Sequence, residues 1–357
     1  MSSRLIVNSI RHTGASGDAV SLANDGTCTA NITSVNGGQL GNRRLNINGG
    51  FQVFQRSTSA TGVGSSEGYF APDRYQQKGT GNMRYTASQS TDVPAGYGFS
   101  NSLKYDCTTA SGTVDAGHYV AIEHRMEGQD VQVFCKGTAQ AKQFTISFHV
   151  KSPKTGVHWV EFYDDDNDRH VCKSYTISSA NTWQKISLTF PADTTGAFPS
   201  DNGSSLRIFF WLMAGTTYTG GGTPPSTWAA FTANKRATGQ VNVFDSTSND
   251  FFITGIQLEV GSVATDFEHR LHGHELALCE RYYQDSFEYH HLNASNGESD
   301  RWIRFRTEMR ASPTVTTSPT NSVSFGVHVT TSNGFSGDGS GNSHANFNLG
   351  WTASAEL

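Results

Sequence analysis

The sequence contains few charged residues and no long apolar segment. Asp, Glu, Lys and Arg make up 16% of the 357 residues, and the formal net charge is −5. Proteins that bind nucleic acid usually present a basic face, so this balance argues against a nucleic-acid partner. No apolar run reaches the length of a membrane-spanning helix, and residues 1–7 lack the sustained apolar core of a secretory signal. We therefore expect no membrane insertion, and synthesis in a cytoplasm.

Cysteine pairs and the common catalytic motifs are also missing. The 5 cysteines are scattered and form no C-x-x-C pair, so we expect free and mostly buried thiols. The sequence has no H-E-x-x-H, no P-loop and no G-x-G-x-x-G that leads into a helix. We predict that the protein is not an enzyme. Paired carboxylates for glycoside cleavage depend on distances in space, so a glycan hydrolase stays open as an alternative.

Short segments of alternating polarity recur along the chain, separated by turn residues. The clearest is segment 142–151, in which Thr145, Ser147 and His149 lie on the side expected to face water and large apolar residues lie on the other. The first such strand is expected at residues 51–56 and the last at 252–260. Eight or more segments of this kind, with turns about every ten residues, favour an all-β protein with a two-sheet sandwich.

Several of these segments carry recognisable motifs. Residues 254–270 read TGIQLEVGSVATDFEHR and residues 275–283 read ELALCERYY; upstream, 48–56 read NGGFQVFQR and 69–75 read YFAPDRY. These motifs resemble a recurrent module of tail-fibre and minor structural proteins of tailed bacteriophages, over roughly residues 46 to 285. Residues 309–316 resemble a strand that commonly follows this module. The resemblance implies a jelly roll similar to carbohydrate-binding modules.

We expect four parts along the chain. Residues 1–46 are predicted to be an N-terminal stem or virion-attachment segment, 47–270 a jelly-roll sandwich, 271–285 a short linker helix and 286–357 a C-terminal β tip domain. Within the last part, the glycine-rich stretch 334–342 is expected to be an exposed tip. The first part has too few large apolar residues to form a core alone. The resemblance implies that three chains pack together there; an unordered tail is the alternative.

Aromatic side chains near turns are the candidates for ligand binding, because the apolar face of a sugar ring stacks on an aromatic ring. Trp159 and Tyr163 precede the acidic turn 164–168, and Tyr218 and Trp228 lie in the expected loop 215–228. The alternative for each is a half-buried position in the core or in a subunit interface.

Some carboxylates in the sequence are candidate metal ligands. The alternating carboxylates of 164–168 are of the type that Ca²⁺ binds, but Arg169 and Tyr175 stand where an EF-hand loop needs Gly and Glu. An exposed hairpin turn is therefore the prediction for this segment. The resemblance implies a structural Ca²⁺ near the first and last strands of the module, with Glu259 as the nearest carboxylate.

The resemblance also implies a function. It predicts a homotrimeric tail fibre protein of the virion tail, synthesised in the host cytoplasm and attached to other phage tail proteins through its N-terminus. Three copies would bind a host surface glycan or protein without covalent chemistry, and presenting three weak sites together raises avidity. Besides the hydrolase, the alternative is a structural adaptor or decoration protein of the virion that has no receptor role.

Overall fold

The protein is built almost entirely from antiparallel β-sheets. The computed structural model describes residues 7–11, 13–14, 16–22, 28–30, 41–291, 301–321, 323–340 and 346–357. In the predicted stem, β1 (Ser9–Ile10), β2 (Val20–Leu22) and β3 (Cys28–Ala30) form a 3-stranded sheet. Residues 1–6, 12, 15, 23–27 and 31–40 of that segment lie outside the described residues. The all-β prediction is confirmed.

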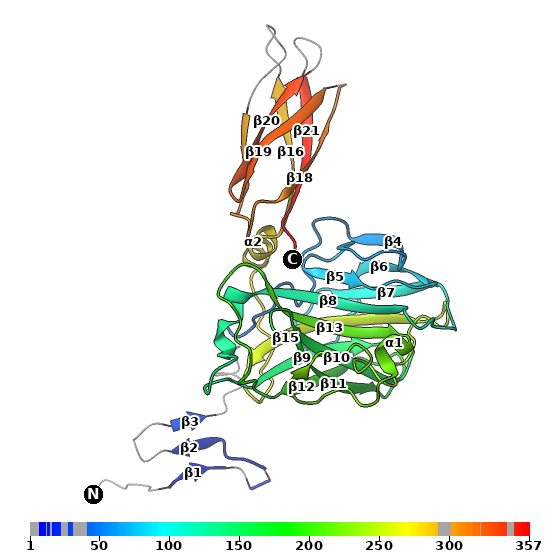
Figure 1. Ribbon diagram of the computed structural model, residues 1–357, viewed down its shortest axis with the longest axis vertical. Helices are drawn as coiled ribbons and strands as arrows, with labels where there is room; N and C mark the ends of the chain where they lie inside the picture. The colour runs from blue at the N-terminus through cyan, green and yellow to red at the C-terminus, as the bar shows by residue number, and fades with distance from the viewer. Residues whose placement is uncertain are drawn as a thin grey trace, which may run out of the picture.

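Two 6-stranded sheets form the central sandwich (Figure 1). The first has the order β14-β11-β10-β13-β8-β5, with β5 (Tyr75–Lys78), β8 (Tyr119–Glu127), β10 (Gly156–Asp164), β11 (Arg169–Ile177), β13 (Ser204–Ala214) and β14 (Ala229–Ala230). The second has the order β12-β9-β15-β7-β6-β4, with β4 (Ser59–Val63), β6 (Arg84–Ser90), β7 (Ser102–Thr109), β9 (Phe144–Lys151), β12 (Gln184–Phe190) and β15 (Asp250–Val260). Because neighbours such as β8 and β13 are distant in sequence, the chain crosses repeatedly between the sheets, as it does in the predicted jelly roll.

Alternating side chains of both sheets meet in one core. Phe148 from β9 packs edge-on against Phe210 from β13, with ring centroids 5.2 Å apart and an interplanar angle of 85°. Phe144 and Phe162 make a similar contact between the same two sheets at 4.9 Å. Edge-to-face aromatic packing is favourable beyond the area that it buries. The apolar half of each alternating strand therefore holds the sandwich together.

The polar side of β9 is buried, so the expectation that it faces water is wrong. Thr145, Ser147 and His149 are 0%, 4% and 4% exposed. The chain that follows β15 folds back over them, so that the Thr145 hydroxyl donates to the Gly261 carbonyl at 2.8 Å. Tyr97 covers His149 from the other side, with ring centroids 4.4 Å apart. Both faces of this strand are buried because a loop, rather than a third sheet, covers the outer one.

Residues 51–56 are not a strand, which corrects a second expectation. The Asn48 side chain organises this segment as a turn: its carbonyl oxygen accepts from the backbone N–H groups of Gln52 and Val53 at 3.0 and 3.1 Å. Its amide group donates back to the Val53 carbonyl at 2.8 Å. These bonds use backbone groups that a sheet would otherwise pair. The turn packs on β15, where the Ile256 N–H donates to the Gly49 carbonyl at 2.9 Å.

Helix α2 (His272–Glu280) follows the sandwich and precedes the C-terminal strands (Figure 1). Its buried Glu275 accepts from the Asn48 N–H at 2.5 Å and from the Arg44 guanidinium, which ties the helix to the Asn48 turn. After the helix, the Tyr282 hydroxyl donates to Glu127 at the end of β8. Among the described residues, no helix is long and apolar enough to cross a membrane.

A buried arginine connects the C-terminal strands to the sandwich. Arg74 has a fully buried side chain that pairs with Glu356, near the end of the chain, and its guanidinium lies 3.3 Å from the Tyr282 ring centroid. Glu356 also pairs with Arg56 at 3.0 Å. Two arginines from the sandwich thus bind one carboxylate from the C-terminal part, which fixes the two parts to each other.

The C-terminal part contains two 3-stranded sheets, in the orders β16-β21-β18 and β17-β20-β19. Their strands are β16 (Tyr283–His291), β17 (Arg301–Arg304), β18 (Thr314–Pro319), β19 (Ser324–Thr331), β20 (Gly334–Ser340) and β21 (Asn346–Ser354). A second core, including Phe305, Phe335 and Trp351, lies among these strands. The expected exposed tip at 334–342 is wrong for its described residues, because β20 is the central strand of its sheet. A Cβ at Gly337 would lie 2.2 Å from the Gly326 carbonyl oxygen, so glycine there permits close approach of the strands.

The free-thiol prediction is confirmed for the cysteines whose side chains are described: Cys107, Cys135, Cys172 and Cys279 are unpaired. Burial raises the pKa of the Cys107, Cys172 and Cys279 thiols. These side chains therefore act as small apolar groups within the fold rather than as reactive thiolates.

Buried histidines make the stability of the sandwich depend on pH. Burial lowers the pKa of His158 to about 4, from a usual 6.5. Between these values the unfolded chain binds more protons than the folded chain, so the free energy of unfolding falls as pH falls from about 6.5 to 4. The contribution of His158 is at most about 3 kcal/mol. We expect His158→Gln to reduce the loss of thermal stability between neutral pH and pH ~4.5.

Thermal unfolding at a series of pH values checks this prediction. His272→Gln is the matched control, because His272 is exposed and its replacement should leave the pH dependence unchanged. A His158→Gln variant whose unfolding temperature falls with pH as steeply as that of the control would contradict the prediction.

Candidate functional site

The outer face of the first sheet carries a cluster of aromatic side chains. Trp159 and Tyr163 lie on β10 at positions that alternate with the core residues Val160 and Phe162, so they point away from the core. Tyr218 reaches the same face from the short helix α1 (Thr216–Thr219). We call this surface the aromatic face; it comprises Tyr119, Trp159, Tyr163, Phe209, Trp211, Tyr218 and Phe231. Three of the four side chains predicted to bind a ligand are thus brought together here.

A buried ion pair lies beneath the aromatic face. The Arg236 guanidinium lies 4.7 Å from the Trp211 ring centroid and 5.3 Å from that of Phe231. Its Nε atom donates to both oxygens of Glu161, at 3.0 and 2.9 Å. Glu161 also accepts from the Trp211 indole N–H at 3.1 Å and is fully buried. Because Arg236 comes from the loop that covers the sheet, this pair holds the loop against β10.

A pocket of about 260 Å³ opens beside this pair. Its lining residues are Lys78, Tyr119, Tyr163, Asp165, Arg207, Phe209, Phe231 and Arg236. The rings of Tyr163 and Phe231 contact each other edge-on, with centroids 5.1 Å apart. Both are half-buried, so part of each ring remains available to a ligand.

Polar groups at the pocket are held in place by neighbouring side chains. Arg207 donates from Nε to Asp165 at 2.8 Å and from Nη2 at 2.5 Å. The Tyr163 hydroxyl donates to Asp168 at 2.9 Å, and burial together with this hydrogen bond raises the pKa of Tyr163 to about 12. The hydroxyl therefore stays protonated at neutral pH. Flat aromatic walls next to fixed donors and acceptors can bind a molecule that has both an apolar face and hydroxyl groups.

Trp228, the fourth predicted side chain, lies elsewhere. Its ring packs at the edge of the main core, with its centroid 6.4 Å from that of Phe144. The indole N–H donates to the Pro191 carbonyl at 3.1 Å. The adjoining cavity holds only about 10 Å³, room for no more than a water molecule. The structure therefore separates Trp228 from the other three aromatic side chains.

The surroundings of Glu259 do not fit a Ca²⁺ ion. Its carboxylate accepts from the Thr265 N–H and hydroxyl, each at 2.8 Å, and from the Gln257 amide at 3.0 Å. Arg43 pairs with it at 3.2 Å. Calcium needs six to eight oxygen ligands, whereas these neighbours are hydrogen-bond donors and a cation.

The acidic turn is a hairpin, as predicted. Asp164 at the end of β10 pairs in register with Arg169 at the start of β11. The Asp164 carboxylate accepts from the backbone N–H groups of Asp166 and Asn167 at 3.1 and 3.0 Å and pairs with Lys136 at 2.5 Å. Its oxygens therefore cap the turn and bind a lysine.

One further group has the composition of a metal site. The ligand atoms of Glu161, His170 and Cys172 lie within 4.8 Å of one another, the single group of this kind in the described parts of the chain. However, Arg236 and Trp211 already donate to Glu161, and His170 Nδ1 lies 3.0 Å from it. A guanidinium thus supplies the positive charge that a metal would bring, and the group does not fit a metal ion.

Several residues that line the pocket are not among those predicted from the sequence. Phe231 and Arg236 belong to an irregular segment without polarity pattern, so only the folded chain brings them to the sheet. Arg207 gave a usable signal, because it is a charged residue inside the apolar strand β13 and must therefore lie on the outer face.

No family model matches the sequence, and a search of curated proteins finds no match. Among solved structures, the enzymatically active domain of tailspike protein 4 of bacteriophage CBA120 is similar over 61% of this chain, with a TM-score of 0.32 and 15% identity. This chain spans only 22% of that tailspike chain.

Two other similar structures are matched over nearly their whole length. The family 11 carbohydrate-binding module of the Clostridium thermocellum cellulase Lic26A-Cel5E matches 59% of this chain and 98% of its own, with a TM-score of 0.28 and 12% identity. A putative sugar binding protein from Bacteroides thetaiotaomicron matches 61% of this chain and 100% of its own, with a TM-score of 0.31 and 10% identity.

The ion pair beneath the aromatic face gives a stability prediction. Glu161→Gln removes the charge that compensates buried Arg236, and breaking a buried pair in this way costs about 3–5 kcal/mol of unfolding free energy. Urea unfolding measures the effect. Asp245→Asn is the control, because the Lys154–Asp245 pair is 30% exposed on each side and should contribute about 1 kcal/mol or less. Equal losses in the two variants would show that Glu161 does not hold the covering loop.

Proposed function

We propose that this protein is a tail fibre or short tail appendage protein of a bacteriophage virion, which binds a host surface glycan at the aromatic face. The observation that carries the proposal is the pocket between Tyr163 and Phe231, with Arg207 and Asp165 at its side. The motifs at residues 48–56 and 254–270, which resemble phage tail proteins, support the virion role.

A saccharide fits the chemistry of this pocket. A sugar ring has an apolar face that stacks on an aromatic ring, and its hydroxyls both donate and accept hydrogen bonds. Arg207 is a donor and Asp165 an acceptor, and the hydrogen bonds between them fix both before a ligand arrives. Preorganised groups lose little conformational freedom on binding, which favours affinity.

The same pocket supports binding rather than hydrolysis. Most glycoside hydrolases use two carboxyl groups on either side of the scissile bond. Asp165 is the single carboxylate among the described residues that line this pocket, and it accepts two hydrogen bonds from Arg207. We therefore propose that the protein is not an enzyme and that its contacts with the host are non-covalent.

The trimer is part of the proposal. In the small sheet β1–β3, the apolar side chains Ile10 and Leu22 are 54% and 44% exposed. Two or three short strands are at best marginally stable in isolation. Packing of three copies would cover these side chains and order the segment, which would also attach the fibre to other tail proteins.

An adaptor without a receptor role is the second candidate. Phe287 and Tyr289 on β16 are 69% and 68% exposed, so the C-terminal part presents apolar surface that a second virion protein could cover. Such side chains on a strand at the edge of a sheet favour contact with another protein.

Binding of host glycans tests the receptor role. We expect Tyr163→Ala to weaken binding of the trimeric protein to purified host surface polysaccharide about tenfold, because one aromatic contact is lost. Tyr163→Phe keeps the ring and should retain most of the affinity. The control is Tyr289→Ala, which removes an exposed tyrosine from the C-terminal part. If all three variants bind like the wild type, the aromatic face is not the receptor site.

Light scattering tests the assembly. The full chain is expected to have the mass of a trimer, and a chain that starts at Asn46 is expected to be a monomer, because the truncation removes the contacts between stems. A full chain that stays monomeric at micromolar concentration would contradict the trimer. A truncated chain that remains trimeric would place the contacts in the sandwich or the C-terminal part.

A further inference from the structure

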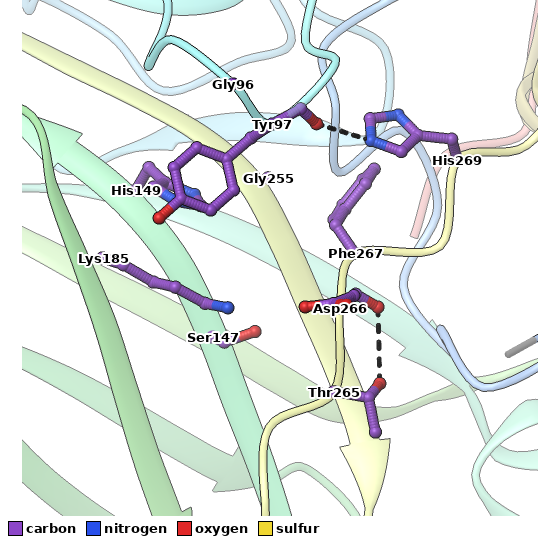
Figure 2. A pocket seen from close by; sticks show the side chains of 10 residues that line it. All are labelled: Gly96, Tyr97, Ser147, His149, Lys185, Gly255, Thr265, Asp266, Phe267 and His269. Carbon is purple, nitrogen blue, oxygen red and sulfur yellow. Dashed lines mark hydrogen bonds between the residues drawn. The ribbon is translucent and has the colours of Figure 1, made fainter. Parts of the chain in front are cut away.

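A second pocket has a volume of about 310 Å³, and Figure 2 shows the residues that line it. It lies on the opposite side of the sandwich from the aromatic face. Its base is the outer face of the second sheet, where His149 on β9 pairs in register with Lys185 on β12 and Thr254 on β15. Its walls are the loop that contains Tyr97 and the returning segment that contains Asp266. The pocket is thus built from five separate parts of the chain and shares no residue with the aromatic face.

A β-bulge shapes the base of this pocket. The register of β15 against β9 shifts between Thr254 and Gln257, and Gly255 at the bulge has a φ of +65°. A Cβ at Gly255 would lie 2.4 Å from the Phe99 ring and 3.1 Å from His149 Nδ1. Bulges change the direction of side chains beside functional sites. Here the bulge needs glycine both for its backbone angle and for the space above it.

His149 presents an unsatisfied polar group to the pocket. The residue is 4% exposed, and neither of its ring nitrogens has a hydrogen-bond partner in the described structure. Burial, together with the nearby charge of Lys185, lowers its pKa to about 4, so the ring is neutral at physiological pH. A neutral imidazole offers one donor and one acceptor. Leaving such a group without a partner is costly, and a ligand that fills the pocket would supply one.

Two opposite charges complete the lining. Lys185 on β12 and Asp266 on the returning segment are both exposed, and both point into the pocket (Figure 2). Neither side chain forms an ion pair with another residue in the described parts of the chain. A ligand with a single charge would be attracted by one and repelled by the other. Groups that both donate and accept hydrogen bonds, such as hydroxyls, suit Lys185, Asp266 and His149 equally.

Tyr97 provides an aromatic surface next to these polar groups. Tyr97 is 47% exposed, and the centroid of its ring lies 4.4 Å from the centroid of the His149 ring. The Lys185 ammonium lies 5.9 Å from the centre of the same ring. A ring with one apolar face and several hydroxyls matches this combination.

We propose that this pocket, lined by Tyr97, His149, Lys185 and Asp266, is a second binding site, which takes one uncharged sugar ring. The Tyr97 ring covers the apolar face of the sugar. Lys185 donates to one hydroxyl, Asp266 accepts from another, and the imidazole of His149 pairs with a third. This site does not depend on the aromatic face, and each can bind when the other is disabled.

Imidazole NMR tests the proposal on the full chain. The His149 signals are assigned by comparison with His149→Gln, and the protein is titrated with neutral methyl glycosides of glucose, galactose, mannose and N-acetylglucosamine at millimolar concentrations. We expect at least one glycoside to shift the His149 signals in a saturable manner. Lys185→Met and Asp266→Asn should each weaken that binding about tenfold, because each removes a hydrogen bond to a charged group.

Two controls separate this site from the aromatic face. Lys235→Met replaces an exposed lysine elsewhere, and Tyr163→Ala disables the first pocket; neither should change the titration of His149. If no glycoside shifts His149, or if Lys185→Met and Asp266→Asn leave the shift unchanged, the proposal is wrong. A shift with glycine or another zwitterion, but with no glycoside, would also overturn the assignment to a sugar. If Tyr163→Ala loses polysaccharide binding but its His149 signals still shift with the glycoside, the result supports two independent sites.

Discussion

The fold depends on one constraint: each large sheet has two faces, and the shared core covers only one of them. The outer face of the first sheet carries Glu161 and Trp211, and that of the second carries Ser147 and His149, all of them buried. Loops rather than further sheets provide the cover, and loops bring their own polar groups. Where their cover is incomplete, a pocket remains. Both candidate binding sites are such gaps, which explains why each combines aromatic rings with charged side chains.

Buried arginines join parts of the structure that are distant in the sequence. Arg236 binds Glu161 beneath the aromatic face, Arg74 binds Glu356 between the sandwich and the C-terminal strands, and Arg44 binds Glu275 in α2. A guanidinium can lie against an aromatic ring while it donates to a carboxylate, as Arg74 does against Tyr282. Such pairs add little net stability compared with apolar packing, but they are costly to break singly. They therefore fix the orientation of loops and domains that have small cores of their own.

Much of the fold was predictable from local patterns. The alternation from Phe144 to Val150 identified a core strand correctly, and the acidic turn between Asp164 and Arg169 was recognised as a hairpin. Prediction failed in two segments. Asn48 converted an apparent strand at 51–56 into a turn, and in β20 glycines that look typical of an exposed tip permit close strand packing. The turn is decided locally, by Asn48 just before the segment, whereas the burial of β20 depends on the neighbouring strands β17 and β19.

For the candidate sites, the sequence by itself determined which residues of a strand share a face: Trp159 and Tyr163 lie together outside the core because side chains alternate along β10. Only the tertiary structure decided what covers that face. It placed Tyr218 and Arg236 over it, left Trp228 at the edge of the core, and turned the polar side of β9 into the base of a pocket. The physical reason is the distance along the chain over which each effect acts. Alternation is a property of neighbouring residues. The cover comes from loops tens of residues away, whose position depends on hydrogen bonds and ion pairs formed only in the folded chain.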